Sequence, residues 1–259
     1  MLSELRQKHF LSYLAERKAA QIGELSAAFG VSASTVRRDL QDMEVRGLVR
    51  RIHGGVLLPD DDCDVREAVV LERAAQHAEA KARIGQAAAA LVRDNSTIII
   101  TAGTTVEAML PHLGGRVGLT VITNAVNVAS ALARRPSIDV IVLGGWLRHS
   151  EFSLLGHLTM QAIQDLRADQ IFHGIFGIHV EHGLSGAYIQ EVQTDRAMIS
   201  AARELIVLAD HSKFGRIGRV RLLPVDAIRT VVTDLETPAT DVETLRQRNI
   251  AVIQTGETP

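Results

Sequence analysis

Residues 30–40 read Gly-Val-Ser-Ala-Ser-Thr-Val-Arg-Arg-Asp-Leu, which predicts the end of one helix, a tight turn and the start of another helix. Gly30 suits the position after a helix, where a positive φ is often needed, and Ser32 suits the N-cap of the next helix. Apolar side chains at helical spacing then share one face that can pack inward: Val36, Leu40 and Met43. Two short helices joined by such a turn are typical of a helix-turn-helix.

The polar residues of the second helix gather near its N-terminal end, which carries a partial positive charge. Short hydroxyl groups and two adjacent arginines at this place suit entry into a DNA major groove. The alternative is an amphipathic helix whose arginines are simply solvated. The candidate DNA contacts on this helix are Ser32, Ser34, Thr35, Arg37 and Arg38.

The flanking sequence favours DNA binding over the solvated helix. Apolar stripes predict helices at residues 3–18 and 24–29, ahead of the third helix at residues 33–46. Two β-prone runs around Gly54-Gly55 then predict a hairpin. Three basic side chains of this hairpin would reach phosphates or the minor groove: Arg50, Arg51 and His53. Three helices and a basic hairpin make a winged helix-turn-helix domain over residues 1–58.

The charge of the 259-residue chain is unevenly divided, although its formal net value is only −2. Residues 1–58 carry nine Lys/Arg and six Asp/Glu, and the remainder carries 19 and 24. A basic small domain joined to an acidic larger one fits an anionic partner for the first domain. Pro59 and three aspartates open an acidic linker at residues 59–75 that leads into a connecting helix, and residues 76–259 form the second domain.

Several classes of protein are excluded by what the sequence lacks. The single cysteine, Cys63, excludes an intrachain disulfide and a Cys-cluster metal site. The N-terminal residues have no signal-peptide segment, and every apolar run is too short to span a bilayer, so we expect a cytoplasmic protein without membrane contact. His173, His179 and His182 lack metal-ligand spacing, and we find neither a Walker loop nor a nucleophile-base order. We therefore expect no metal, no cofactor and no catalytic residue.

Beyond residue 95, short apolar runs alternate with helical segments. The expected strands are residues 97–100, 119–122, 139–143, 170–174, 205–209, 230–233 and 251–254, and the expected helices are 105–113, 126–133, 159–166, 191–202 and 242–247. This alternation predicts an α/β fold with a mostly parallel sheet covered on both faces. Residues 65–92 are helical in pattern and form one helix or two, because His77 and Gly85 are weak points.

Polar turns with glycine fall at the carboxyl ends of these strands, where ligands bind in open parallel sheets. Gly103-Thr104-Thr105 offers hydroxyl and backbone N–H groups suited to a phosphate, although it is also a plain capped turn. Together the turns would supply a phosphate cradle, amides and cations to a small phosphorylated ligand. The candidate ligand-binding residues are Gly103, Thr104, Thr105, Thr123, Asn124, Gly144, Gly145, Arg148, Glu191, Asp210 and Lys213.

Both domains resemble the DeoR-type bacterial transcriptional regulators over nearly the whole chain. In the first domain the resemblance is carried by residues 31–40 together with Arg51-Ile52-His53-Gly54-Gly55. In the second it is carried by Gly103-Thr104-Thr105, Thr123-Asn124, Gly144-Gly145, Gly156, residues 169–177, Gly183-Leu184, Glu191 and residues 210–215. The resemblance implies a sensor domain similar to ribose-5-phosphate isomerase and the CoA transferases. It also implies repression of carbohydrate catabolic genes, relieved by a phosphorylated sugar or related effector.

Two residues depart from the family pattern. Thr101 stands where the family often has Asp, and Asp195 stands where many members have Lys before Arg196. The loss of a cation and the gain of an anion leave open a subgroup with a different effector.

We expect a homo-oligomer, dimer or tetramer, because two winged helices would bind two half-sites of double-stranded operator DNA. The alternative is a sugar-phosphate isomerase with an appended DNA-binding domain, in which a carboxylate would act as acid or base. The available carboxylates are Glu107, Asp169, Glu191 and Asp210, but the isomerase signature is missing. A constitutive architectural DNA binder is a third class, and it would not need the second domain.

Overall fold

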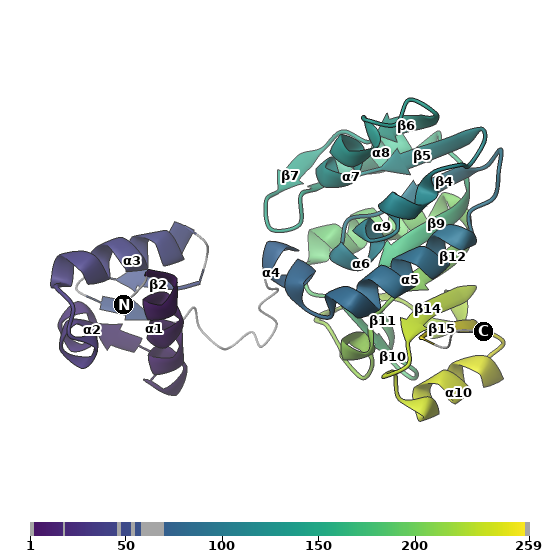
Figure 1. The fold of residues 1–259 in the computed structure, drawn as a ribbon. Coiled ribbons are helices and arrows are strands. Elements are labelled where there is room, and N and C mark those ends of the chain that lie inside the picture. Colours follow the sequence, from purple (N-terminus) through teal and green to yellow (C-terminus); the bar gives the residue numbers. More distant parts are fainter. Residues whose placement is uncertain (1–2, 18, 46–47, 53–54, 58–69, 257–259) are drawn as a thin grey trace. The chain divides into compact units, whose positions relative to one another are not determined.

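The computed structural model describes residues 3–17, 19–45, 48–52, 55–57 and 70–256 (Figure 1). The chain forms two compact units, which lie within residues 1–66 and 67–259. Within the described ranges, no helix is long and apolar enough to cross a membrane.

The N-terminal unit contains the three helices and the hairpin that the sequence predicts. Its elements are α1 (Ser3–Arg17), β1 (Ala19–Gln21), α2 (Ile22–Phe29), α3 (Ala33–Val45), β2 (Arg50–Ile52) and β3 (Gly55–Leu57). The strands form an antiparallel sheet in the order β1-β3-β2. The third strand, β1, was not expected, because three residues are too few to show an alternating pattern.

The turn between α2 and α3 has the geometry that its sequence predicts. Gly30 adopts the left-handed conformation, with φ 62°, at the C-terminal end of α2. The Oγ of Ser32 accepts a hydrogen bond from the Thr35 backbone N–H at 3.2 Å and so caps α3. The apolar face of α3 is fully buried against side chains of α1 and α2: Val36, Leu40 and Met43 pack with Phe10, Leu14 and Leu25.

The seven strands predicted in the second unit form one sheet, in the order β15-β14-β12-β9-β4-β5-β6. They are β4 (Thr97–Ile100), β5 (Leu119–Thr123), β6 (Ile138–Val142), β9 (Ala168–Gly174), β12 (Ala202–Leu208), β14 (Thr230–Asp234) and β15 (Ala251–Thr255). Every neighbouring pair is parallel. The α/β class expected from the sequence is confirmed.

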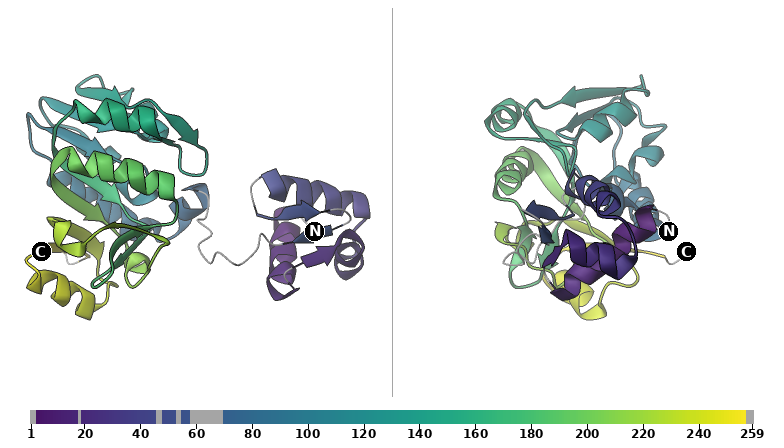
Figure 2. Two further views of the ribbon diagram at one scale, coloured as in Figure 1. Left: turned by 180° about the vertical axis from the view of Figure 1, so that it is seen from behind. Right: turned by 90° about the vertical axis from the view of Figure 1, so that its left-hand side faces the viewer.

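Successive residues of the strands bury into two apolar layers, one on each face of the sheet. Ile98 and Ile100 pack under α5 (Ala78–Ala90), α6 (Thr104–Glu107), the 3-10 turn η1 (Leu110–Leu113) and α7 (Val126–Leu132). Ile99 packs on the other face under α8 (His157–Gln164), α9 (Ile189–Ser200) and α10 (Ala239–Gln247). Figure 1 shows α5 and α6 in front of the sheet, and the left view of Figure 2 shows α9 in front of the opposite face.

One helical prediction is corrected, and one alternative that the sequence left open is decided. The segment 105–113 is not one helix: α6 ends at Glu107 and η1 begins at Leu110, because Pro111 has no N–H to continue the helix. The pattern at residues 65–92 gives two helices, α4 (Val70–Ala75) and α5, which separate at His77 with φ 52°. Gly85, the other weak point, lies inside α5.

Five short strands extend the loops of the second unit and were not predicted. β7 (Trp146–Arg148) and β8 (Ser153–Leu155) form a hairpin. β10 (Gly177–His179), β11 (Gly183–Gly186) and β13 (Val220–Leu223) form a small antiparallel sheet. Two more 3-10 turns, η2 (His211–Lys213) and η3 (Val225–Ala227), complete the unit.

Gly85 allows α5 to touch the backbone of the α6–η1 segment. A Cβ at residue 85 would lie 2.4 Å from the carbonyl carbon and oxygen of Ala108. We expect Gly85→Ala to lower the free energy of unfolding by about 2 kcal/mol, because the clash outweighs the gain in helix propensity. Chemical denaturation of the full chain, followed by far-UV circular dichroism, measures this change.

The control is Gly114→Ala in the same unit, where a Cβ would meet nothing within 4 Å and φ is −62°. There the substitution should stabilise the unit by about 0.5 kcal/mol, because alanine restricts the unfolded chain. Equal stabilisation by both variants would contradict the close packing of α5.

Candidate functional site

The N-terminal half of α3 gathers the candidate DNA contacts on one exposed surface. The Oγ atoms of Ser32 and Ser34 lie 2.8 Å apart, and Ser32 Oγ lies 2.9 Å from the hydroxyl oxygen of Thr35. The side chains of Arg37 and Arg38 are exposed one turn further along. Hydroxyl donors and two guanidinium groups therefore lie together at the N-terminal end of the helix.

The hairpin of the N-terminal unit carries the other candidate DNA contacts. Arg50 and Arg51 lie on β2, where Arg51 pairs with Val56 of β3. His53 lies outside the described residues. The predicted basic hairpin is thus present, with two of its three candidate residues on one strand.

Asp39 belongs to the motif that predicts the DNA-binding helix, yet its carboxylate is buried. It accepts two hydrogen bonds from the Arg6 guanidinium, Nε at 2.5 Å and Nη2 at 3.1 Å, which join α1 to α3. This hydrogen bonding raises the pKa of Arg6 above its ordinary value. Sequence reasoning missed the pair, although a carboxylate between Val36 and Met43 on an apolar helix face was a usable signal.

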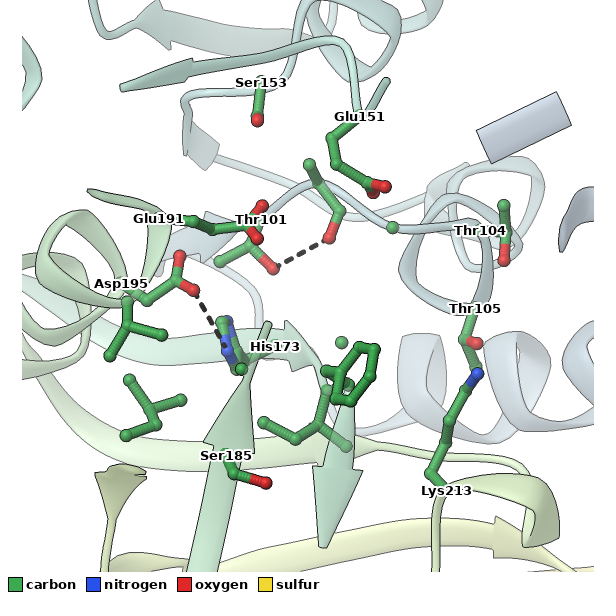
Figure 3. Close-up of a pocket in the computed structure, with 18 of the residues that line it drawn as sticks. Thr101, Thr104, Thr105, Glu151, Ser153, His173, Ser185, Glu191, Asp195 and Lys213 are labelled. Carbon is green, nitrogen blue, oxygen red and sulfur yellow. Dashed lines mark hydrogen bonds and ion pairs between the residues drawn. The ribbon is translucent and has the colours of Figure 1, made fainter. Parts of the chain in front are cut away.

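The second unit has a cavity at the carboxyl ends of β4 and β9 (Figure 3). The two strands are neighbours, but β5 and β6 follow β4 in the chain and lie on its other side, so the strand order reverses between β4 and β9. Ligands of open α/β sheets bind at such a switch point. Six of the predicted residues line the cavity: Gly103, Thr104, Thr105, Asn124, Glu191 and Lys213.

The other five predicted residues lie outside the cavity lining, and the structure gives each a local contact. The hydroxyl of Thr123 donates to the carbonyl oxygen of Ile100 at 2.7 Å. Gly144 accepts a hydrogen bond from Thr159 at 2.6 Å, and a Cβ on Gly145 would lie 2.2 Å from the same hydroxyl oxygen. Arg148 donates to Glu191 at 2.5 Å and therefore acts on the cavity through that carboxylate.

Asp210, the fifth of these residues, is fully buried. Burial alone would raise the pKa of its carboxyl group. Hydrogen bonds from Ser212 and the positive charges of Lys213 and Lys81 outweigh burial and lower the pKa below its ordinary value. Asp210 is therefore ionised beside Lys213, which lines the cavity.

Sequence reasoning missed an ion pair in the cavity wall. Arg73, on α4, donates through Nη2 to both carboxylate oxygens of Glu151, and the Lys81 ammonium donates to the carbonyl oxygen of Arg73. The Glu151 side chain is only 4% exposed. This ion pair could not be predicted from the spacing of residues in the sequence, because its partners lie 78 residues apart.

Three buried polar atoms of residues in the lining have no hydrogen-bond partner: Asn124 Oδ1, Ser153 Oγ and His173 Nδ1. Buried polar atoms normally have partners, and each one without a partner carries a free-energy cost. Three such atoms belong to residues of one cavity lining, where a ligand or bound water with hydrogen-bonding groups would give them partners. Ser153 and His173 were not among the predicted site residues.

His173 lies on β9 and is buried, which lowers the pKa of its imidazole to about 4. The ring is therefore neutral at pH 7. Its Nε2 lies 3.9 Å from a carboxylate oxygen of Asp195 on α9. A neutral ring and a carboxylate thus form one wall of the cavity.

The cavity is small and shares a residue with a second hollow. Its volume is about 60 Å³, and the neighbouring hollow of about 380 Å³ also contacts Thr104. Ligand pockets usually measure roughly 300–1,000 Å³. A ligand larger than a few atoms must therefore displace side chains of the cavity wall.

Two side-chain groups among the described residues could hold a metal ion, although the sequence predicts no metal site. One is His179, Glu181 and His182, and the other is His211, Asp234 and Glu236. In the first group, His179 Nδ1 accepts backbone hydrogen bonds, so in the neutral ring the proton is on Nε2 and blocks that ligand atom. Neither group lines the cavity.

Comparison with known proteins gives the same two-part division. A family model of the DeoR C-terminal sensor domain matches residues 76–235, and a model of the DeoR-like helix-turn-helix domain matches residues 6–62. The chain belongs to the DeoR family. It is a DNA-binding transcriptional regulator with a sensor domain.

Relatives of this DeoR-family regulator are named as repressors. A putative aga operon transcriptional repressor of Escherichia coli O157:H7 is 30% identical over 97% of this chain and 94% of its own. The glycerol-3-phosphate regulon repressor of Escherichia coli K12 is 34% identical, over 88% and 89%. The repressor GlcR of Bacillus subtilis is 32% identical, over 90% and 89%. Among solved structures, ribose 5-phosphate isomerase A of Methanocaldococcus jannaschii is 17% identical over 54% of this chain and 55% of its own, with a TM-score of 0.41.

The burial of His173 has a consequence for stability in acid. Because its pKa is about 4 in the folded chain and 6.5 ordinarily, the unfolded chain binds a proton between these pH values that the folded chain does not. The free energy of unfolding should therefore fall as the pH falls from 6.5 to 4, by up to roughly 3 kcal/mol from this group. His173→Gln should remove this part of the pH dependence in chemical denaturation.

The exposed residue His112 provides the control, because His112→Gln should leave the pH dependence as in the wild type. The same slope in the wild type and in His173→Gln would contradict a buried, neutral imidazole.

Proposed function

We propose that this DeoR-family regulator represses carbohydrate genes and releases its operator when a phosphorylated sugar binds the sensor cavity. The three buried polar atoms without a partner carry this proposal, because a ligand rich in hydrogen-bonding groups would supply the partners that they lack. The relatives named as repressors of the glycerol-3-phosphate regulon and of the aga operon support it.

The phosphate would bind at the side of the cavity formed by Thr104, Thr105 and Lys213. Two hydroxyl groups and an ammonium group are donors, and a phosphate offers only acceptors when it is ionised. The sugar hydroxyls would then reach Asn124 and Ser153. Ligand hydroxyls can donate to both oxygens.

Release of DNA requires that the ligand favour a conformation with lower DNA affinity. Arg73 lies on α4, the first described element after the N-terminal unit, and is one of the residues that line the cavity. A phosphorylated ligand that enlarges the cavity would compete with Glu151 for Arg73 and so shift α4. Couplings of this kind are typically about 1–3 kcal/mol.

The regulator would act as a homo-oligomer, because two copies of α3 reach two half-sites of an operator. Arg37 and Arg38 on α3, together with Arg50 and Arg51 on β2, would make the contacts to bases and phosphates. The hydroxyls of Ser32, Ser34 and Thr35 would lie at the same end of the helix.

The positions and partners of the carboxylates fit a protein that binds its ligand without converting it better than they fit an isomerase. Of the four candidate acid–base residues, only Glu191 lines the cavity, and it is ion-paired with Arg148. Asp169 accepts a hydrogen bond from the Thr97 backbone N–H at the amino ends of β4 and β9, opposite the cavity. Glu107 accepts a hydrogen bond from Asn127 in the neighbouring hollow, and Asp210 is held by Ser212.

Removing either arginine of α3 should weaken operator binding. We expect Arg37→Ala and Arg38→Ala each to cost about 1–3 kcal/mol, because each would remove a contact to a base or a phosphate. Fluorescence anisotropy with the DNA upstream of the chain's own gene, at one fixed salt concentration, measures the affinity. Arg203→Ala is the control, since this arginine is 84% exposed and lies in the sensor unit. Unchanged affinity in both α3 variants would refute the assignment.

Removing donors at the phosphate side should abolish the response to ligand while DNA binding is kept. We expect Lys213→Ala and Thr104→Ala to bind operator DNA as the wild type does. They should no longer be released by the sugar phosphate that releases the wild type, because the phosphate loses charge-assisted hydrogen bonds. The same anisotropy assay with a panel of sugar phosphates tests this. Thr240→Ala, at an exposed position of α10, should respond normally. Normal release in both cavity variants would exclude this cavity.

A further inference from the structure

Two histidine rings of the sensor unit lie in contact outside the cavity lining. The rings of His77 and His211 have their centroids 4.6 Å apart and meet edge to face, with 81° between their planes. His77 lies at the junction of α4 and α5 in the left-handed conformation, and His211 begins η2 after β12. The contact therefore joins the α4–α5 junction to the carboxyl end of a central strand.

Two carboxylates at the end of the neighbouring strand β14 lie close to His211. β12 and β14 are parallel, so the segments that follow them lie at the same edge of the sheet. Asp234 is the last residue of β14 and is buried, whereas the side chain of Glu236 is 74% exposed. One ligand atom from each of these three residues lies within 4.8 Å of the other two. Because His211 and Asp234 are 23 residues apart, the sequence shows no ligand spacing here.

The buried carboxylate of Asp234 fixes the orientation and the tautomer of the His211 ring. Its Oδ1 lies 3.0 Å from Nδ1 of this ring, and its Oδ2 accepts a hydrogen bond from the His211 backbone N–H at 2.8 Å. Because an ionised carboxylate only accepts hydrogen bonds, the proton of a neutral His211 ring lies on Nδ1. The lone pair is then on Nε2. Metal-binding histidines commonly have this arrangement, in which a carboxylate holds one ring nitrogen and the metal binds the other.

The Nε2 atom of His211 faces a second carboxylate at the separation expected of two metal ligands. It lies 3.4 Å from Glu236 Oε2. Hydrogen bonds of the N–H···O type measure roughly 2.7–3.2 Å. Two ligands of a tetrahedral ion with bonds of about 2.0–2.1 Å lie about 3.3–3.4 Å apart. The observed separation therefore fits a metal ion between the two atoms better than a proton.

We propose that His211, Glu236 and His77 bind a divalent transition-metal ion of the zinc class. Nε2 of His211 and Oε2 of Glu236 already lie as two ligands would, and rotation of the exposed His77 side chain supplies the third. Asp234 acts through His211 as its positioning residue. Two imidazoles, a carboxylate and a water suit Zn²⁺, whereas Mg²⁺ and Ca²⁺ prefer oxygen ligands alone.

The ion would fasten the α4–α5 junction to η2, the turn that also carries Lys213. The site contains no residue of the cavity lining, so it does not depend on which effector the cavity binds.

Titration of the full chain with Zn²⁺ alone tests the proposal. Isothermal titration calorimetry on protein purified without a histidine tag should show one ion bound per chain, and millimolar Mg²⁺ should not displace it. Thermal unfolding gives a second readout. Zn²⁺ at about 100 times its Kd should raise the Tm by about 5–10 °C, because the ion binds the folded chain.

The variants Glu236→Gln and His77→Gln should each weaken Zn²⁺ binding at least tenfold. Loss of an outer-shell partner typically costs about 10–100-fold in metal affinity, and loss of a ligand should cost at least as much. Both side chains are exposed, so the variants should fold and keep the wild-type Tm without metal. His182→Gln is the matched control, because it changes the other histidine–carboxylate group and should leave Zn²⁺ binding unchanged.

Three results would overturn the metal site. They are an unchanged affinity in either Glu236→Gln or His77→Gln, a loss of binding in His182→Gln, and no binding of Zn²⁺ to the wild type at submillimolar concentration. The last result would leave His211 as an imidazolium paired with two carboxylates. None of these measurements contains a sugar phosphate, so their outcome leaves the proposed function untouched.

Discussion

The parallel direction of all seven central strands is the constraint on which the sensor unit depends. Parallel neighbours need crossover connections, so every strand delivers its following loop to the same edge of the sheet. The strand order reverses between β4 and β9, and the loops there separate and leave a cavity. Thr104 after β4, Phe176 after β9 and Lys213 after β12 meet there although they are far apart in sequence. The same constraint places Asp169, at the amino end of β9, on the opposite edge.

Much of this arrangement follows from the sequence, because every central strand appears as a short apolar run, even the edge strand β6, in which Ile141 and Val142 are exposed. All seven central strands were predicted for this reason, and so were the three helices and the hairpin of the N-terminal unit. The strands that were missed have three or four residues and contain glycine or polar residues, as in Gly183–Gly186. Their pairing depends on tertiary neighbours, which a local pattern does not contain.

The residues of the candidate site that lie in turns directly after strands could be predicted from the sequence. The residues that reach the site through contacts between distant segments could not. Gly103, Thr104 and Asn124 follow directly from the ends of β4 and β5. The Arg73–Glu151 ion pair does not, because no rule of spacing joins α4 to the loop after β7. His173 was equally hidden, since a histidine on a strand gives no sign of whether its ring is solvated. Burial decides its charge, and burial is known only from the fold.

The charged groups around α4 give the proposed switch a physical basis. Lys81 is largely buried, and desolvation lowers the pKa of its ammonium group to about 8. The charge of Asp210 raises this pKa, whereas the charge of Lys213 lowers it. The protonation of Lys81 therefore depends on the charges next to the cavity. A phosphate bound at Lys213 would add negative charge there and favour the protonated form of Lys81, which donates to the carbonyl oxygen of Arg73. The same phosphate would compete with Glu151 for the Arg73 guanidinium. One anion would therefore act on both the backbone and the side chain of Arg73, and a ligand without this charge would leave α4 in place however well its sugar ring fits.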